Sequence, residues 1–269
     1  MNKILLIAEI GWNHMGNLDL AEKMIKAAKK SGAHYAKFQT WRVKNLKAGP
    51  WDNDGRREIY KKAELTESDY LKILKICKKY KIKFLTSIFN INDFYLLKKL
   101  NLSSIKIPSP ENRNIPLLKF CNKNFKNIFL STGAAKISEI KKSFKVFSKK
   151  KNLNLMHCVS SYPCSDEITN LSRINKLKKI SKNIGLSDHT PDILSSILSL
   201  DYNVNIIEKH FTINNNLPGR DNKFAILPDA MAELSKTIKR YYLMKRKEKE
   251  KFSKQEMEIR KVYTGRWSN

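Results

Sequence analysis

The sequence predicts an α/β fold, namely a single (β/α)8 barrel of the TIM type followed by a C-terminal basic helix. The chain has 269 residues, and a barrel of this kind typically needs ~250. Eight short apolar runs can be counted along it, and a helical pattern follows each one. Such alternation indicates parallel strand pairing. Eight units in this length favour a closed barrel over an open sheet.

The predicted strands are short runs rich in apolar residues that stop abruptly in polar ones. In chain order they are Ile4–Glu9, Tyr35–Gln39, Phe84–Ser87, Ser104–Ile107, Ile128–Ser131, Leu153–His157, Ile184–Ser187 and Asn205–His210. The segments between them carry apolar residues three and four apart, which predicts amphipathic helices. Two such sets are Leu20, Met24, Ala27 and Ala28, and Leu71, Leu74, Ile76 and Cys77.

Two segments stand outside this alternation. Val43–Leu65 is the one long connection, and its Gly- and Asp-rich centre predicts an ordered loop over the barrel mouth. After about Ser235 the chain becomes a basic helix, Thr237–Arg260, and then a short tail. We therefore expect a barrel domain over residues 1–235 and a helix and tail over 236–269.

The composition predicts a cytoplasmic, non-membrane protein. Hydrophobic residues make up 41% of the chain, which is enough for a core, and no run approaches the ~20 apolar residues of a membrane span. The apolar start, Met1–Ile7, is too short for a signal peptide. The four cysteines show no CxxC spacing, so neither a zinc finger nor a redox motif is indicated.

The net charge of +28 invites a nucleic-acid interpretation. The basic residues are nearly all lysines scattered through the predicted helices, where they are typical of solvated faces. The chain is also rich in Asn and Ile, a bias that AT-rich coding produces without any function. We expect no nucleic-acid partner, although the positive field suits acidic substrates.

Polar side chains stand at or just after the end of every predicted strand. They are Glu9, Lys37, Gln39, Ser87, Lys106, Ser109, Ser131, His157, Ser160, Ser187, His189, Glu208 and His210. A barrel brings all these strand ends to one face, where active sites of this fold lie. Lysine is rarely buried in a strand unless it is paired. Lys37 and Lys106, with the ring of serines, predict a cradle for a phosphate and a carboxylate.

Each serine taken singly is better explained as a strand-end or helix-capping residue, so the anion cradle depends on the set. The sequence contains no Gly-rich phosphate loop of the Walker or dinucleotide type.

Two histidine motifs close the last two strands: Ser187–Thr190 and Glu208–Thr212. Glu208 and His210 are two residues apart, so on a strand they face the same way. Two imidazoles from neighbouring strands, with carboxylates beside them, predict part of a divalent-metal site. A lone strand-end histidine is more often structural, and the spacing alone leaves both interpretations open.

These residues resemble the sialic acid (N-acetylneuraminate) synthase family, including its legionaminate and pseudaminate relatives. Seven motifs in the family's order, within residues 8–221, carry the resemblance. They are Ala8–His14, Lys37–Thr40, Lys106–Glu111, Leu130–Gly133, His157-Cys158 with Ser161–Pro163, Gly185–Thr190 and Glu208–Thr212. The chain departs from the family's usual residues at Thr86–Phe89, Ser109–Glu111, Ser160 and Gly219–Asp221, and these are mostly changes of one polar residue for another.

The resemblance implies condensation of phosphoenolpyruvate with an N-acylated hexosamine aldehyde, which gives a nonulosonic acid and phosphate. It implies that His189 and His210 bind a divalent metal, manganese first, with magnesium or cobalt as alternatives. Glu9, Gln39 and Asp221 would contact the acceptor sugar, and Glu111 would stand beside the attacked enol carbon. The implied phosphoenolpyruvate cradle consists of Lys37, Ser87, Lys106, Ser109, Ser131, Ser160, Tyr162 and Ser187.

The resemblance also bears on partners. Family members form homodimers and usually continue into a small antifreeze-like domain that supplies an arginine to the acceptor. The sequence ends at Asn269, where that domain's linker would begin, so we expect a separate antifreeze-like protein or a substitute such as Arg56 or Arg57.

Two alternatives stay open. A related barrel could condense phosphoenolpyruvate with a phosphorylated aldose, which would need a second anion pocket built from Arg56, Arg57 or Arg113. A non-catalytic basic barrel could instead bind through the Thr237–Arg260 helix.

Overall fold

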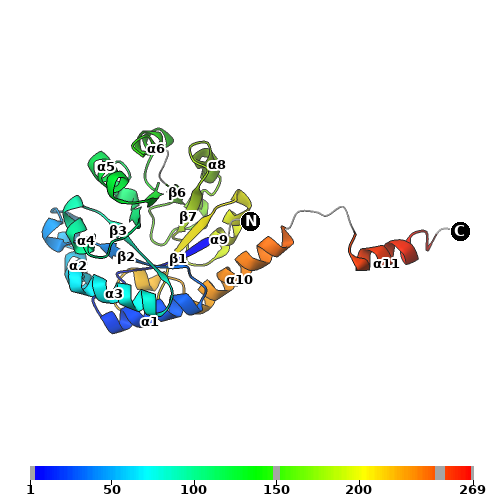
Figure 1. Cartoon of the computed structure of the whole chain (residues 1–269), viewed down its shortest axis with the longest axis horizontal. Helices are drawn as coiled ribbons and strands as arrows, with labels where there is room; N and C mark the ends of the chain where they lie inside the picture. Colours follow the sequence, from blue (N-terminus) through cyan, green and yellow to red (C-terminus); the bar gives the residue numbers. More distant parts are fainter. Residues whose placement is uncertain (1–3, 148–151, 246–251, 268–269) are drawn as a thin grey trace. The chain divides into compact units, whose positions relative to one another are not determined.

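The computed structural model, which describes residues 4–147, 152–245 and 252–267, contains a closed barrel of eight parallel strands (Figure 1). The strands pair in chain order, and β8 pairs with β1 to close the ring. Their bounds are β1 Leu5–Gly11, β2 Tyr35–Thr40, β3 Lys83–Ile88, β4 Ser104–Ile107, β5 Asn127–Ser131, β6 Asn152–Cys158, β7 Ile184–Asp188 and β8 Ile206–His210. Each predicted strand is present within two residues of its expected bounds, which confirms the (β/α)8 fold.

Within residues 4–238, helices follow the strands and lie around the outside of the barrel (Figure 1). The α-helices are α1 Leu18–Lys30, α2 Arg56–Ala63, α3 Glu67–Lys79, α4 Tyr95–Lys98, α5 Ile115–Asn124, α6 Ile137–Phe144, α7 Asp166–Thr169, α8 Arg173–Lys178, α9 Leu194–Leu198, α10 Pro228–Met244 and α11 Lys254–Tyr263. Short 3-10 helices are η1 Val43–Asn45, η2 Pro50–Asp52, η3 Ile91–Phe94, η4 Ser109–Glu111, η5 Ser199–Tyr202 and η6 Asp221–Lys223. No helix in the described part of the chain is long and apolar enough to cross a membrane.

The apolar face predicted for α3, the helix directly before β3, is largely wrong. In α3 the buried residues are Tyr70, Ile73 and Cys77, whereas only Cys77 of the predicted set is buried. The reason is Tyr70, which buries its ring while its hydroxyl donates to the Gln39 carbonyl over 3.0 Å. A tyrosine whose hydroxyl finds a partner can take a core position, and the buried face of α3 is therefore the one that carries Tyr70, Ile73 and Cys77.

The Val43–Leu65 connection is more regular than the predicted loop, because it contains η1, η2 and the whole of α2. Tyr60 of α2 stacks on Trp12 at the end of β1, with ring centroids 5.0 Å apart. Gly16 fixes the same junction at its backbone: its φ is 78°, and an added Cβ would lie 2.3 Å from the Lys62 carbonyl oxygen. The connection is therefore docked onto the β1–α1 turn near the barrel mouth.

The buried His14 in this turn should make the fold sensitive to acid. Its Nδ1 accepts a hydrogen bond from the Gly16 amide, and burial lowers its pKa from 6.5 to about 4. Between pH 6.5 and about pH 4, the unfolded chain therefore binds a proton at His14 that the folded chain does not bind. The free energy of unfolding thus falls as the pH drops through this range. The difference amounts to about 3 kcal/mol. Urea unfolding at pH 7 and at pH 4 measures how much the free energy of unfolding falls between the two pH values. We expect this fall to be about 3 kcal/mol smaller in His14→Gln than in the wild type. An equal fall in both proteins would contradict the role of His14.

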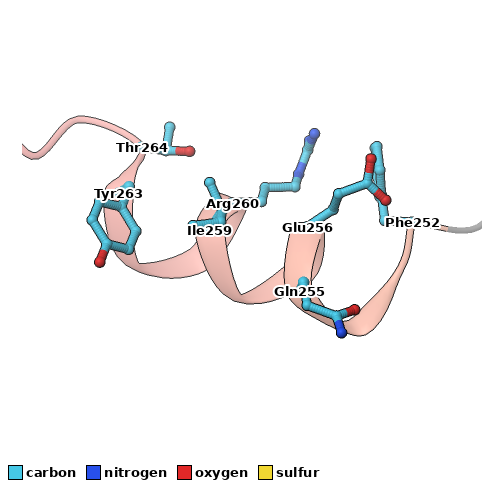
Figure 2. Close-up of a pocket in the computed structure, with 7 residues that line it drawn as sticks. All are labelled: Phe252, Gln255, Glu256, Ile259, Arg260, Tyr263 and Thr264. Atoms are coloured by element: carbon cyan, nitrogen blue, oxygen red, sulfur yellow. The ribbon is translucent and has the colours of Figure 1, made fainter.

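The chain divides into two compact units, Met1–Ile238 and Lys239–Asn269. The predicted single helix Thr237–Arg260 is wrong, because α10 ends at Met244 and α11 begins at Lys254; residues 246–251 lie outside the described part. Ser253 caps α11 through a capping box with Glu256, and this is a helix-start signal. Figure 2 shows a hollow on α11 lined by side chains that include Phe252, Ile259 and Tyr263; none of the predicted site residues lines it.

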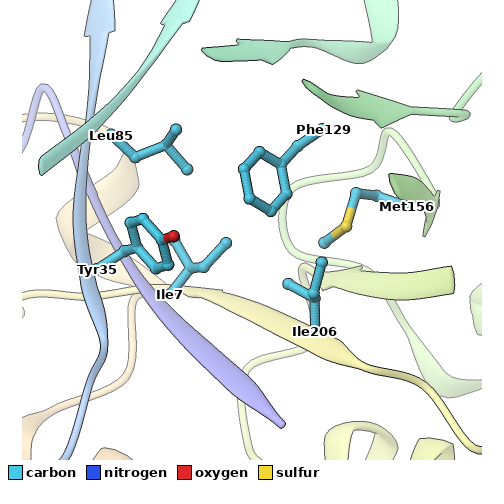
Figure 3. Packing of buried hydrophobic residues seen from close by; sticks show 6 residues of the cluster. All are labelled: Ile7, Tyr35, Leu85, Phe129, Met156 and Ile206. Atoms are coloured by element: carbon cyan, nitrogen blue, oxygen red, sulfur yellow. The ribbon is translucent and has the colours of Figure 1, made fainter. Parts of the chain in front are cut away.

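A layer of apolar side chains fills the barrel interior. Six strands contribute to it, and the side chains point toward one another in Figure 3: Ile7, Tyr35, Leu85, Phe129, Met156 and Ile206. Because successive strand residues alternate between faces, the residue two places further along each strand also points inward. Those residues are Glu9, Lys37, Ser87, Ser131, Cys158 and Glu208. The interior thus changes from apolar to polar toward the carboxyl ends of the strands, and the polar layer is the candidate site.

Candidate functional site

Two lysines and two glutamates form an ionic cluster inside the barrel. Lys37 Nζ lies 2.7 Å from Glu9 Oε2 and 3.8 Å from Glu208 Oε1, and Lys106 Nζ pairs closely with the same Glu208 oxygen. All four side chains are at most 4% exposed. The two ammonium charges are matched by two carboxylates, which is how buried charges are tolerated. Only Lys37, Lys106 and Glu9 of this cluster are among the predicted site residues.

Burial and attraction compete in this cluster. Burial raises the pKa of Glu9 above its ordinary value, and Lys37 only partly offsets that effect. Burial also acts against the charge on Glu208, yet Lys106 and Lys37 hold the pKa of that carboxyl below its ordinary value. Glu208 is therefore an ionised carboxylate between two ammonium groups.

Three further predicted residues bond to the ionic cluster. Ser87 Oγ accepts from Lys37 Nζ at 3.1 Å, and Gln39 Nε2 donates to Glu9 Oε1 at 2.6 Å. Ser187 Oγ donates to Glu208 Oε1 at 3.0 Å and lies 3.2 Å from Lys106 Nζ. Lysine and serine donors thus converge on a single carboxylate oxygen. Donors arranged in this way also suit an anionic ligand.

The serines of strands β4 to β6 lie beside this cluster. Ser109 Oγ accepts from the Gly133 amide at 3.1 Å and donates to Cys158 Sγ at 3.3 Å. An added Cβ on Gly133 would lie 2.4 Å from Ser160 Oγ, so Ser160 is close to the same point. Ser131 Oγ is buried and has no hydrogen-bond partner among the described residues. A buried hydroxyl without a partner is uncommon in folded proteins and suits a position that contacts a ligand.

The two predicted imidazoles meet at the ends of β7 and β8. The ring centroids of His189 and His210 lie 5.4 Å apart, and both side chains are 6% exposed. Tyr162 covers them, with its ring 4.1 Å from that of His189 and 5.8 Å from that of His210. The structure therefore places Tyr162 against the imidazoles, and its described ring contacts are with them and with Phe224 rather than with Lys37 or Lys106.

The imidazole pair fits a divalent metal as part of a ligand set. His189 Nδ1 lies 2.6 Å from the Val159 carbonyl oxygen and so donates to it, which leaves Nε2 free to act as a ligand. His210 Nδ1 is buried without a hydrogen-bond partner among the described residues. Burial holds the pKa of His210 well below 6.5, so its ring is neutral, the form that binds metals. Within residues 4–147, 152–245 and 252–267, no three His, Cys, Asp or Glu side chains converge as a full ligand set. Water or substrate oxygens would complete the shell.

Asp221 joins the imidazoles to an aromatic wall. Its Oδ2 lies 3.5 Å from His210 Nδ1 and accepts a short hydrogen bond from Trp12 Nε1. Burial raises the pKa of Asp221 to about 6, partly offset by the Trp12 bond. Trp12 in turn stacks on Tyr60 and meets Trp41 edge-on at 6.2 Å. The Val43–Leu65 connection thus reaches the site through Tyr60, which agrees with its predicted place at the mouth.

Several predicted residues make their described side-chain contacts outside these clusters. Glu111 is partly exposed, and its described side-chain hydrogen bond is with Asn114 at 2.7 Å. His157 faces outward and bonds to the Thr169 carbonyl over 2.9 Å, so it is structural. The arginines considered for a second anion pocket already have acidic partners: Arg56 pairs with Asp54, Arg57 with Asp52 and Arg113 with Glu139.

The structure places further residues in the site to which the sequence assigned no substrate role. Glu208 is the centre of the ionic cluster, and its place two residues before His210 was the signal for it. Cys158, which faces inward where His157 faces outward, lies 3.9 Å from His189 Nδ1. Burial opposes charge on both groups, but their mutual attraction lowers the pKa of Cys158 and raises that of His189. Trp12 and Tyr60 were assigned no substrate role either, and no local pattern marks them.

Comparisons with known proteins bear on this site. The NeuB family model matches residues 24–250. The N,N'-diacetyllegionaminic acid synthase of Campylobacter jejuni is 36% identical over 255 residues, which cover 89% of this chain and 76% of that protein. A pseudaminic acid synthase of the same species is 32% identical over 238 residues, which cover 83% and 69%.

Among solved structures, the crystal structure of N-acetylneuraminic acid synthetase from Leptospira borgpetersenii superimposes with a TM-score of 0.87 at 31% identity. The match covers 99% of this chain and 94% of that one. The similarity therefore extends over nearly the whole of both chains.

Proposed function

The chain belongs to the NeuB family, and on that premise we propose that it condenses phosphoenolpyruvate with an N-acylated hexosamine and releases phosphate, so that a nonulosonic acid of the sialic type is formed. The observation that carries the proposal is the buried ionic cluster at the carboxyl ends of the strands. Lys37 and Lys106 converge there with serine donors, and an anionic substrate with a phosphate and a carboxylate needs such donors.

The reaction makes one carbon–carbon bond and breaks one carbon–oxygen bond. C3 of phosphoenolpyruvate bonds to the acceptor's aldehyde carbon, and the aldehyde oxygen takes up a proton. Water adds to C2, and the bond from C2 to the phosphate oxygen then breaks. We assign Lys37, Lys106, Ser87 and Ser187 to the anionic groups of phosphoenolpyruvate. Ser109, Ser131 and Ser160 complete that cradle.

The acceptor side of the site is assigned to Glu9, Gln39 and Asp221. Glu9 and Gln39 bond to each other beside the ionic cluster, and Asp221 lies beside His210. Tyr162, which the resemblance gave to the phosphoenolpyruvate cradle, is here better assigned to the imidazole side. Glu111 is assigned to assist the attacking water, as a carboxylate base can do.

We propose that His189 and His210 hold a divalent metal, manganese first, with magnesium or cobalt as alternatives. When bound, such a metal supplies Lewis-acid polarisation of the acceptor's aldehyde. Imidazole is a common ligand for transition metals, and oxygen donors from water suit manganese.

We place the protein in the reducing cytoplasm, because all four cysteines are buried and free. The homodimer and the antifreeze-like partner expected from the resemblance stay predictions.

Purified protein should release phosphate from phosphoenolpyruvate only when manganese and an N-acylated hexosamine are both present. N-acetylmannosamine, a diacetylated hexosamine and a phosphorylated aldose should be compared at equal concentrations. We expect turnover with at least one of the first two and none with the aldose phosphate, because the three candidate arginines are already paired. Turnover with the aldose phosphate alone would favour the related barrel synthases. Salt-dependent DNA binding without phosphate release would favour the non-catalytic barrel.

A further inference from the structure

A second buried ion pair lies directly behind the imidazoles, on the outward face of the same two strands. Asp188 and Lys209 are register partners on β7 and β8, and Lys209 Nζ lies 3.2 Å from Asp188 Oδ2. Both side chains are 1% exposed. Because strand residues alternate between faces, this pair points toward the helix layer while His189 and His210 point into the site.

Fold stability alone does not explain this pair. The layer between strands and helices is apolar in this kind of barrel, and taking two charges out of water costs several kcal/mol per ion. Apolar residues of similar volume are often as stable or more stable in such a place. Because the fold does not require this pair, its hydrogen bonds to neighbouring residues indicate another role.

The pair holds the residue that follows His189. The Thr190 amide and hydroxyl both donate to Asp188 Oδ1, at 2.9 and 2.8 Å, and Lys209 Nζ donates to the Thr190 carbonyl at 2.5 Å. Ser196 of α9 donates to the other Asp188 oxygen at 2.6 Å. Every polar group of Thr190 is thus bonded to one member of the pair, so the backbone just after His189 is tied to β8.

We propose that Asp188 and Lys209 are positioning residues that fix His189 against His210 so that both imidazoles can bind one divalent cation. The inference rests on the proposed function, because it concerns the metal site assigned there. Replacing a residue that orients a metal ligand typically lowers metal affinity by about ten- to a hundredfold. The two lysines of the phosphoenolpyruvate cradle come from β2 and β4, and Ser187, which neighbours Asp188 on β7, bonds to Lys106 and Glu208 rather than to this pair.

The test uses the whole chain and three variants: Asp188→Asn, Lys209→Met, and the double variant Asp188→Leu with Lys209→Met. Manganese affinity is measured by electron paramagnetic resonance of free Mn²⁺, and phosphoenolpyruvate affinity by calorimetry without metal. Each single variant should raise the manganese Kd about ten- to a hundredfold and leave the phosphoenolpyruvate Kd within about twofold. The double variant has no unpaired buried charge, so its Tm should exceed that of either single variant, while its manganese affinity should stay low.

Ser143→Ala is the matched control, because it removes a buried hydrogen bond to the Asn112 carbonyl far from the pair along the barrel. It should lower the Tm and change neither Kd. If the double variant regains both the Tm and the manganese affinity, the pair serves stability only and the inference is overturned. If all variants bind manganese as the wild type does, the inference alone fails. A wild type that binds phosphoenolpyruvate but no manganese would overturn the metal assignment together with this inference.

Discussion

Lys106→Met should weaken phosphoenolpyruvate binding by about a hundredfold or more. Lys106 is 4% exposed and bonds to Glu208 and Ser187, so it is a buried, hydrogen-bonded charge at the centre of the cradle. Truncating one partner of a buried, hydrogen-bonded charge pair between protein and ligand costs about 2–5 kcal/mol of binding free energy, and 1.4 kcal/mol corresponds to tenfold in Kd. Calorimetry with phosphoenolpyruvate, without acceptor, measures the effect directly. The far-ultraviolet circular dichroism spectrum checks that the barrel is intact.

Glu208→Gln is the matched variant with the opposite expected sign. Without substrate, Glu208 Oε1 accepts from Ser187 and Lys106, which are the donors that the substrate's anionic groups would need. Removing its charge leaves two buried ammonium groups with a single carboxylate, so phosphoenolpyruvate should bind more tightly than to the wild type. If Lys106→Met binds phosphoenolpyruvate with unchanged affinity, Lys106 is not part of the cradle. Weaker binding to Glu208→Gln would show that Glu208 supports the substrate rather than competing with it.

His210→Ala should lower metal-dependent turnover about a thousandfold. Lewis-acid stabilisation is worth several kcal/mol, and about 4 kcal/mol corresponds to that factor. The variant should also bind manganese weakly while it binds phosphoenolpyruvate normally, because the ionic cluster holds no imidazole. Chelation should abolish the wild-type activity, and manganese should restore it.

His157→Gln is the control for His210→Ala. His157 is also buried and stands near the end of a strand, but it points outward to the Thr169 carbonyl. The control should keep manganese affinity and turnover close to those of the wild type. Full metal-dependent activity in His210→Ala would remove His210 from the metal site.

The fold could be predicted because strand–helix alternation is a local signal. Eight apolar runs, each ending in polar residues, fix the number of strands, and their parallel pairing follows from the helices between them. The helix at Arg56–Ala63 could not be predicted in this way. Its sequence is mostly charged, and Tyr60 packs on Trp12, which lies far away along the chain. The break between α10 and α11 did have a local signal, the capping box at Ser253 and Glu256.

The site could be predicted in part, and its residues differ in how much local information marks them. Lysine within a strand is unusual enough to single out Lys37 and Lys106 from the sequence. His157 and Cys158 could not be told apart, because both faces of a barrel strand are buried. The alternation of Asn and Leu over residues 152–155 therefore does not say which face points inward. The partnership of Glu208 with two lysines depends on closure of the barrel, which brings β8 near β2 and β4. No local pattern contains that information.

We propose that this barrel joins a three-carbon unit from phosphoenolpyruvate to an amino sugar. Mass spectrometry of the products, from purified protein with phosphoenolpyruvate, manganese and an N-acylated hexosamine, tests it most directly. We expect a new 2-keto acid that is heavier than the sugar by one pyruvic acid, formed in equal amount with inorganic phosphate. Free pyruvate with phosphate and an unchanged sugar would contradict it, since that result means hydrolysis without carbon–carbon bond formation.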